Sequence, residues 1–443
     1  MKKIILIFCT ILIFYESEAQ PPQDSIWTLE ECVSYALEQN IQIRKSGLNN
    51  NRYEIYAEQA KAQRFPSASA SANQNFGWSK NTMTGGSGFS GSNSSNYSLS
   101  SGITIFSGSK LTNQIRQAEL DIQGGQYSLE TTKESISLNI LDAYLQILYA
   151  EEQVKNSEKQ IESTGSQVNL AAERLATQLI SQADYAQVKS QLASEKLTLA
   201  NSKSQLAIAK VNLEQLMELP VTDDFTIAHP AFPEPVNQNR IPDVRSVYET
   251  ALAIKPQIKN AAVTKEIAAF DEKIAKAGYY PSLSASAGVS TGYNYSGTSA
   301  ENDSYFDQLN DAIHPSAGLS LSIPIYQRRQ VKTSIETAKI GYQDAELTEI
   351  DTKNQLRKNI EQACLDVTSA QIEYEASLEN YRATLVSSVL SDEKFKQGII
   401  NSVDYLVSKT NLIIAESQLL QSKYNLIYSY KVLDFYSGIP LSL

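Results

Sequence analysis

The chain consists of two copies of one unit, and this duplication limits the possible fold more than any other feature of the sequence. Identical residues recur 215 positions apart in the first part of each unit and 220 positions apart afterwards. Such pairs include Lys61/Lys276, Pro66/Pro281, Ile103/Ile323, Asp184/Asp404, Tyr185/Tyr405 and Pro220/Pro440. The change of spacing falls in a loop, where length differences are tolerated. We therefore expect residues 20–218 and 243–443 to adopt the same fold, joined by a Pro-rich linker at 219–242.

Each unit contains a segment in which small polar and apolar side chains alternate. In SASASANQNFGWS, residues 67–79, one parity holds Ser, Asn and Gly, and the other holds mainly Ala and aromatic residues. Residues 282–296 repeat the pattern, and a period of two indicates a β-strand. A Ser/Ala linker or an edge strand of a soluble sandwich would explain one copy, but the repeat favours strands. We predict β-hairpins at 67–106 and 282–326, with a Gly/Ser/Asn loop at 81–96.

Long helices are predicted for the rest of each unit. No proline occurs between positions 107 and 219, and apolar residues recur every seven positions. One series is Ile115, Ile122, Leu129, Ile136, Ala143 and Ala150, and another is Leu192, Leu199, Leu206 and Leu213. Heptads indicate packed, supercoiled helices, because an ordinary amphipathic helix rarely exceeds about 25 residues. We predict helices at 28–64, 110–178 and 181–218 in the first unit. In the second unit we predict an equivalent opening helix before the hairpin, followed by helices at 328–397 and 401–437.

Residues 1–19 are predicted to be a secretory signal peptide. Two lysines precede an apolar run from Ile4 to Phe14, and small residues follow at the cleavage spacing. The run is shorter than the ~20 residues of a spanning helix, and the alternative is an uncleaved anchor. In the mature chain, Cys32 and Cys364 are not repeat equivalents, so we favour two buried thiols over a disulfide.

The composition argues against nucleic-acid binding and against catalysis. Removal of the signal peptide leaves the net charge at −11, which disfavours nucleic acid as a partner. The two histidines, His229 and His314, lie in no metal-ligand or catalytic-triad spacing, and the Gly-rich stretches lack a phosphate-binding motif. We therefore expect a protein that is not an enzyme and that has no metal site or cofactor.

The strand lengths indicate a membrane role that several chains share. Strands of about 10 to 14 residues suit a bilayer, where a tilted strand needs ~9 to 11. Four strands cannot close a barrel, and open strand edges cannot lie in lipid, so two chains would give eight strands and three would give twelve. We expect the small polar face to line a wet lumen and the apolar face to meet lipid. Four aromatic residues are predicted at the membrane interface, with ordinary surface aromatics as the alternative: Phe76, Trp78, Tyr293 and Tyr295.

The order and duplication of these features resemble the TolC-like outer-membrane efflux proteins. The stretches that carry the resemblance are TLEECVSYALEQN after the export signal, RFPSASAS and YYPSLSAS before the hairpins, and the paired DY turns. The resemblance implies a mainly helical homotrimer with a shared 12-stranded transmembrane β-barrel and a long α-helical periplasmic tunnel. It also implies an outer-membrane exit duct of a tripartite efflux or secretion system, working passively with an inner-membrane transporter and a periplasmic adaptor protein.

The resemblance further implies two functional regions at the far end of the long helices. The family's tip turns, which receive the adaptor, match Gln178-Leu179-Ile180 and Gly398-Ile399-Ile400, and Gln178 departs from the family's glycine. The acidic residue at the narrow tunnel entrance matches Asp404, whose repeat equivalent is Asp184, while Val407 occupies the next acidic position. From the residues alone, both aspartates also suit helix N-terminal caps.

An exported trimeric coiled-coil adhesin or structural fibre is the alternative from another functional class. It would share the export signal, the heptads and the Ser/Gly-rich loops. It would not explain two hairpins with alternating faces, or two short helices that together match the length of one long helix.

Overall fold

The structure is a computed structural model that describes residues 26–80, 89–220, 225–230, 243–296 and 303–443. The predicted signal peptide and most of the predicted linker lie outside these residues. The first repeat contains α1 (Leu29–Gln39), α2 (Ile41–Ala62), β1 (Ser67–Lys80), β2 (Phe89–Ser107), α3 (Lys110–Ala176) and α4 (Gln182–Met217). The second contains α5 (Val244–Ile254), α6 (Pro256–Ala277), β3 (Ser282–Ser296), α7 (Tyr305–Asp311), β4 (His314–Ser322), α8 (Gln330–Lys396) and α9 (Ser402–Tyr436).

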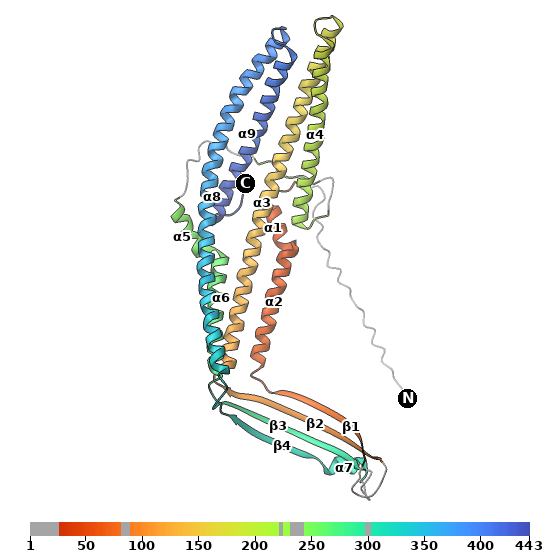
Figure 1. The fold of residues 1–443 in the computed structure, drawn as a ribbon, viewed down its shortest axis with the longest axis vertical. Helices are drawn as coiled ribbons and strands as arrows, with labels where there is room; N and C mark the ends of the chain where they lie inside the picture. Colours follow the sequence, from red (N-terminus) through yellow and green to blue (C-terminus); the bar gives the residue numbers. More distant parts are fainter. Residues whose placement is uncertain (1–25, 81–88, 221–224, 231–242, 297–302) are drawn as a thin grey trace, which may run out of the picture.

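The molecule is elongated, with long helices at one end and a single sheet at the other (Figure 1). The sheet is antiparallel in the order β1-β2-β3-β4, so the hairpins of the two repeats are joined by pairing of β2 with β3. The turns between α3 and α4 and between α8 and α9 lie farthest from the sheet. The prediction of a mainly helical chain with a small strand part, built from a duplicated unit, is confirmed.

The predicted helix at 28–64 is two helices, broken at Asn40, and the opening helix of the second repeat is broken at the equivalent Lys255. Asn40 Nδ2 donates to Leu216 O at the end of α4 (2.8 Å). Lys255 precedes a proline, which favours an extended backbone. Its buried Nζ lies 3.1 Å from Glu134 Oε1 and 3.1 Å from the centroid of the Phe435 ring near the end of α9. In both repeats, the break is therefore held by the end of the returning helix.

The first hairpin differs from its prediction because β2 begins at Phe89, inside the segment 81–96 that we predicted as a loop. Its residues are mostly Ser, Asn and Gly, which are typical of loops, but their backbone pairs with β1 along the whole strand. In the second hairpin, β4 ends at Ser322, before the predicted boundary at 326, and the short helix α7 precedes it. Neither the polar start of β2 nor the short helix α7 shows a hydrophobic period in the sequence, so neither was predicted.

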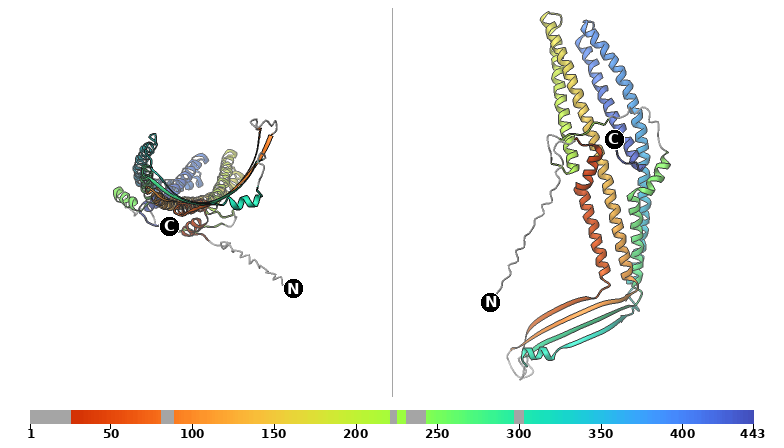
Figure 2. Two further views of the ribbon diagram at one scale, coloured as in Figure 1. Left: turned by 90° about the horizontal axis from the view of Figure 1, so that it is seen from below. Right: turned by 180° about the vertical axis from the view of Figure 1, so that it is seen from behind.

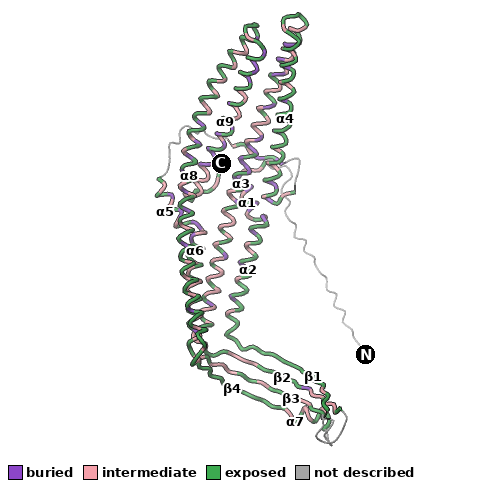
Figure 3. Tube along the Cα trace, in the orientation of Figure 1, coloured by how far each residue is buried: buried purple, intermediate pink, exposed green. Residues whose placement is uncertain are grey.

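The largest core cluster joins α1, α3, α4 and α9 near the middle of the molecule, where buried residues concentrate (Figure 3). Tyr144 is fully buried there, and its hydroxyl donates to Ala228 O (2.7 Å) and Trp27 O (3.2 Å). The N-terminal segment and part of the connection between the repeats are thereby attached to α3. Cys32 and Cys364 are free and buried, as the sequence favoured, and burial raises the pKa of the Cys32 thiol to about 12.

The heptad prediction is right for α3 and, on α4, right only near the core, where Leu213 is buried and Leu206 packs against the largest core cluster. Buried residues recur every seven positions along α3: Ile136, Ala143, Ala150, Ser157, Thr164 and Ala171. The buried residues of α4 opposite this stripe are Val188, Glu195 and Ser202, and Leu192 and Leu199 are only half-buried. Ser157 Oγ lies 3.4 Å from Ser202 Oγ, so polar contacts occupy seam positions that a leucine series would otherwise fill.

Candidate functional site

Both tip turns have the same backbone but different residues at the position that needs a left-handed conformation. In the first turn, Leu179 N donates to Arg174 O (2.8 Å) and Gln178 has φ +58°. In the second turn, Ile399 N donates to Lys394 O (2.9 Å) and Gly398 has φ +75°. This is the Schellman pattern, which favours glycine because a Cβ is strained at positive φ. The same difference recurs at the ends of α4 and α9, where Glu218 and Gly438 have φ +58° and +79°.

Replacement of Gln178 by Gly is expected to stabilise the first turn by about 1 kcal/mol, because a left-handed non-glycine residue costs about 1–2 kcal/mol. The reverse change, Gly398→Gln, is expected to destabilise the second turn by a similar amount. Thermal unfolding of the two variants beside the unaltered protein checks both signs. A lower unfolding temperature for Gln178→Gly would contradict the prediction and show that the Gln178 side chain makes a stabilising contact.

Asp184 caps α4 and also bonds to the second tip. Ser181 is the N-cap of α4, and its Oγ accepts from the Asp184 N–H (3.1 Å) while Asp184 Oδ2 accepts from the Ser181 N–H (3.2 Å), which together form a capping box. Asp184 Oδ2 also accepts from Ser181 Oγ (2.6 Å). Its other oxygen, Oδ1, accepts from Ser402 Oγ at the start of α9 (2.5 Å). The Ser181 and Ser402 donors hold the pKa of this carboxyl below its usual range. The capping interpretation therefore describes this carboxylate. It also joins the two helical hairpins, which are α3 with α4 and α8 with α9.

Replacement of Ser402 by Ala is expected to weaken this link by about 1 kcal/mol, which corresponds to about fivefold faster hydrogen exchange in the first turn of α9. Because the pKa of Asp184 is lowered, its contribution is full at neutral pH and is lost as the pH falls through that lowered pKa. Hydrogen exchange with mass spectrometry measures the effect at neutral pH and at a pH below the lowered pKa of Asp184. Ser194→Ala, at an exposed serine on α4, is the matched control. Equal exchange in Ser402→Ala and the control would contradict the prediction.

Arg174 was not predicted as a functional residue, and it makes the second link between the two helical hairpins. Its guanidinium donates to Phe395 O (3.1 Å) and Lys396 O (2.5 Å), so a cation covers the C-terminal carbonyls of α8. It also lies 5.8 Å from the centroid of the Phe395 ring, which stacks on Tyr405 at 4.6 Å. A basic residue in the last turn of α3 is ordinary in sequence, and only the tertiary structure shows that it reaches α8.

Asp404 differs from Asp184 in its surroundings. Its N–H donates to Asn401 Oδ1 (2.8 Å), so Asn401 is the N-cap of α9. The Asp404 side chain is exposed, and its carboxylate accepts no hydrogen bond within the described ranges. Val407 is also exposed, one turn further along α9. The carboxylate predicted at the tunnel entrance is thus available to solvent, whereas its repeat equivalent is held by hydroxyl groups.

A buried polar network lies behind the tips, where α9 meets α3 and α4. Glu195 Oε2 accepts from Thr164 Oγ1 (2.5 Å), and Glu195 Oε1 lies 3.7 Å from Lys409 Nζ. Lys409 also donates to the Thr164 hydroxyl. The exposed fractions of Lys409 and Glu195 are 7% and 5%, and burial lowers the pKa of the lysine. An ion pair removed from water joins the first repeat to the second at this level.

The sheet has two chemically different faces. The pairing register places Ala70, Leu99, Val289 and Pro315 in one row and Ser69, Ser100, Gly288 and Ser316 in the next. Rows alternate in this way along the strands, and Ser69 and Ser100 share a hydrogen bond of 2.9 Å. Most strand residues are exposed (Figure 3). The predicted division into an apolar parity and a Ser/Asn/Gly parity thus holds over most of the sheet, and Gln74, Asn93 and Ser95 form a polar patch on the apolar parity.

The predicted aromatic residues share the apolar face at the end of the sheet near α7. Phe76 and Trp78 are 63% and 72% exposed, and Tyr295 lies in the same row as Phe76, across Asn93. The Tyr293 ring lies 4.8 Å from that of Tyr305 in α7. Seen from below, the sheet bends into an arc with α7 on its outer side (Figure 2). The apolar face is therefore convex, and the Ser/Asn/Gly face is concave.

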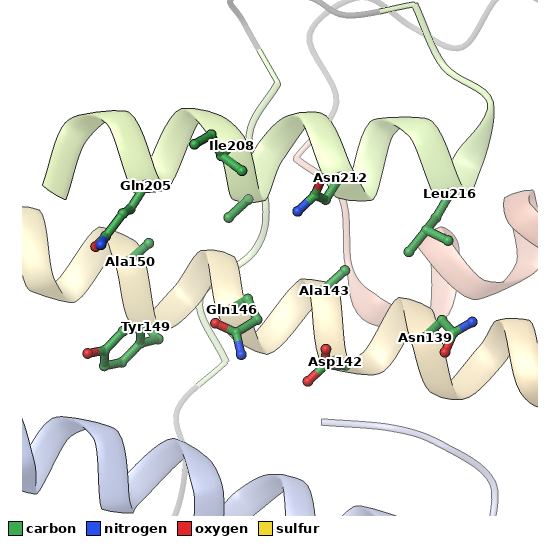
Figure 4. Close-up of a pocket in the computed structure, with 11 residues that line it drawn as sticks. Asn139, Asp142, Ala143, Gln146, Tyr149, Ala150, Gln205, Ile208, Asn212 and Leu216 are labelled. Carbon is green, nitrogen blue, oxygen red and sulfur yellow. The ribbon is translucent and has the colours of Figure 1, made fainter. Parts of the chain in front are cut away.

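One groove of the helical part is open and lined in part by amide side chains. This groove of about 640 Å³ lies between α3 and α4, with Asn139, Gln146, Gln205 and Asn212 along it (Figure 4). Gln146 and Gln205 are exposed, so the groove is an open surface. Within the described ranges, no three acidic, histidine or cysteine side chains gather as metal ligands. In the same residues, every helix is too short or too polar to span a bilayer.

Solved structures with the same fold are outer-membrane channels and related membrane proteins. CusC aligns with a TM-score of 0.76, at 16% identity over 96% of each chain. The Campylobacter jejuni CmeC outer membrane channel aligns at 0.76, with 16% identity over 93% of this chain and 85% of that chain. The Neisseria gonorrhoeae MtrE outer membrane channel aligns at 0.71, with 19% identity over 94% and 90%. At sequence identities this low, the TM-scores establish a common fold.

A family-level comparison goes further than the fold. No curated protein matches the chain. The family of outer membrane efflux proteins matches residues 32–218 and 247–438, one match for each repeat. These two segments make up most of the chain. The chain therefore belongs to the outer membrane efflux protein family.

Proposed function

We propose that three copies of this chain form the exit duct of a tripartite efflux or secretion system in the outer membrane. The observation that carries the proposal is the two-faced sheet. A convex apolar face suits lipid, and a concave face of Ser, Asn and Gly suits water in a lumen. The helices continue from the same end of the sheet and give the duct its periplasmic length (Figure 1).

The edges of the molecule support assembly of several copies. β1 and β4 are the outer strands of the sheet, and unpaired strand edges cannot lie in lipid. We expect β4 of one copy to pair with β1 of the next, so that three copies close one 12-stranded barrel. In the helical part, the edge helices α2 and α8 expose apolar side chains that such packing would cover: Leu48, Ile55 and Tyr56 on α2, and Ile340, Leu347 and Ile372 on α8.

The tip turns are the proposed docking surface for a periplasmic adaptor protein. Leu179 and Ile399 are 75% and 65% exposed at the end of the molecule farthest from the sheet. Ile400 instead packs beside Phe395 and Tyr405, so Ile399 is the exposed apolar side chain of the second turn. An inner-membrane transporter would supply the energy, and the duct would conduct passively.

The oligomeric state tests this proposal. The detergent-extracted protein is expected to have three times the mass of one mature chain in native mass spectrometry, and to lie in the outer-membrane fraction of the cell. A stable dimer would contradict the shared 12-stranded barrel. A monomeric protein in the soluble fraction would contradict the duct as a whole.

Asp404 is the proposed gate residue, because three exposed carboxylates near a threefold axis would attract cations. Asp404→Asn is expected to reduce the cation preference of the channel until cations and anions permeate about equally. Reversal potentials in a salt gradient measure this preference. Asp351→Asn removes the same charge from an exposed position of α8 and is the control. An unchanged preference in Asp404→Asn would leave this residue outside the gate.

A further inference from the structure

A band of basic residues lies where the strands join the helices. We call it the basic collar, and it comprises residues 61–66, 107–112, 276–281 and 323–332. These four segments contain no acidic residue, although the chain has a net charge of −11. They contain seven basic residues: Lys61, Arg64, Lys110, Lys276, Arg328, Arg329 and Lys332. The collar is thus a local reversal of the charge of the molecule.

Contacts between the segments show that the collar is continuous. Arg64 Nη2 donates to Thr112 Oγ1 (3.4 Å), which joins the first segment to the second. A Cβ on Gly108 would lie 2.7 Å from Tyr280 Cβ, so the second segment touches the third. Gln327 Nε2 donates to Gly278 O (3.1 Å), which joins the third segment to the fourth. The four junctions therefore form one row across the base of the sheet.

Three of the collar's cations are unpaired. Lys61, Lys276, Arg329 and Lys332 have carboxylate partners between 2.8 and 3.9 Å away. Arg64, Lys110 and Arg328 are exposed and have no carboxylate partner among the residues that the structure describes. Lys110 is the first residue of α3, where the helix dipole disfavours a cation. Arg328 likewise precedes α8, so neither of these two charges stabilises the helix that it adjoins, which points to an external anion.

Exposed aromatic side chains place the collar at a membrane surface. Phe65, Tyr279 and Tyr280 are 71%, 55% and 58% exposed beside the basic residues. Eleven residues separate Phe65 from Phe76, which is ~36 Å along a strand and ~28 Å along the membrane normal at a ~40° tilt. That separation is close to the ~25 Å apolar band between the two aromatic girdles of an outer-membrane protein. The collar therefore lies at the interface opposite to that of Phe76 and Trp78.

We propose that the basic collar binds the phosphates of anionic phospholipid headgroups in the periplasmic leaflet of the outer membrane. This inference rests on the orientation given by the proposed function. Arg64, Lys110 and Arg328 supply the unpaired charges, at the first, second and fourth junctions of the row. Tyr279 and Tyr280 provide the amphipathic surface that keeps the headgroups at this depth. Each basic residue near an anionic surface strengthens such binding about fivefold.

Lipid binding by the purified oligomer tests the collar. The oligomer is incubated with vesicles of phosphatidylglycerol or phosphatidylcholine, and the lipid it retains is counted by native mass spectrometry. The unaltered protein is expected to prefer phosphatidylglycerol, and the preference is expected to fall at high salt. The triple variant Arg64→Gln, Lys110→Gln, Arg328→Gln is expected to bind phosphatidylglycerol about fivefold more weakly for each charge removed. The control variant Lys155→Gln, Lys196→Gln, Arg382→Gln removes three exposed, unpaired charges from the described helices and is expected to keep the preference.

Equal retention of the two lipids by the unaltered protein would overturn the inference without any variant. Equal loss of phosphatidylglycerol in the collar and control variants would also overturn it, because net charge would then explain binding. Displacement of the lipid by millimolar inorganic phosphate would show a phosphate site instead of a headgroup surface. Conductance of the same preparation separates the two proposals. A conducting protein without lipid preference contradicts the collar alone, and a non-conducting protein with the preference contradicts the duct alone.

Discussion

Replacement of Ala287 by Arg is expected to block membrane insertion, whereas the same change at the neighbouring Ser286 is expected to be tolerated. Both residues are exposed and lie near the middle of β3. Ala287 pairs with Ser101 and Ala317 on the convex apolar face, where an arginine would meet lipid. An arginine at the bilayer midplane costs about 2–4 kcal/mol in each copy of an outer-membrane strand protein.

Ser286 offers the matched control, because it adjoins Ala287 and its side chain points to the other face. Its cross-strand partners are Gly102 and Gly318, which leave room for a long side chain on the concave side. The yield of assembled protein in the outer-membrane fraction measures the difference. A strong loss for Ala287→Arg beside a near-normal yield for Ser286→Arg is the expected result. Equal yields, or the reverse order, would contradict the assignment of the convex face to lipid.

Replacement of Lys409 by Met is expected to destabilise the contact between the two helical hairpins by about 3–5 kcal/mol. Methionine keeps most of the side-chain length but removes the charge that faces Glu195. The glutamate would then remain 95% buried with only Thr164 and Gln191 as donors among its described contacts. Removal of one partner from a buried ion pair leaves an unpaired charge, which is the costly case.

The double variant Lys409→Met, Glu195→Gln is expected to recover most of this loss, because no buried charge remains unpaired. Apparent thermal unfolding temperatures of the two single variants, the double variant and the unaltered protein complete a double-mutant cycle. The expected order places both single variants well below the other two proteins. A single variant as stable as the unaltered protein would show that water reaches this network in the assembled state.

The duplication and the strand alternation allowed much of the fold to be predicted. The period of two in residues 67–79 placed Ala70 and Phe76 on one face, and the pairing register has them there. The heptad of α3 likewise marked the stripe that is buried. Both signals are local, because a side chain's face depends only on its position along its own strand or helix. Such periodicity survives whatever the element packs against.

Features that depend on contacts between distant segments could not be predicted. The breaks at Asn40 and Lys255 are held by residues at the ends of α4 and α9, far away in sequence. The links from Arg174 to α8 and from Asp184 to Ser402 likewise join hairpins from different repeats. The start of β2 was missed because its polar residues lack alternation, although pairing with β1 makes them a strand. The tip residues Gln178 and Gly398 could be identified, but their roles in docking stay predictions.

Single-channel recording of the purified oligomer in a planar bilayer tests the central claim most directly. The account predicts discrete, cation-selective conductance steps from a protein that native mass spectrometry shows to be a trimer. The concave face of Ser, Asn and Gly would line the conducting path through the membrane. A folded trimer that inserts into the bilayer and gives no steps would contradict the duct, and would favour an exported coiled-coil fibre.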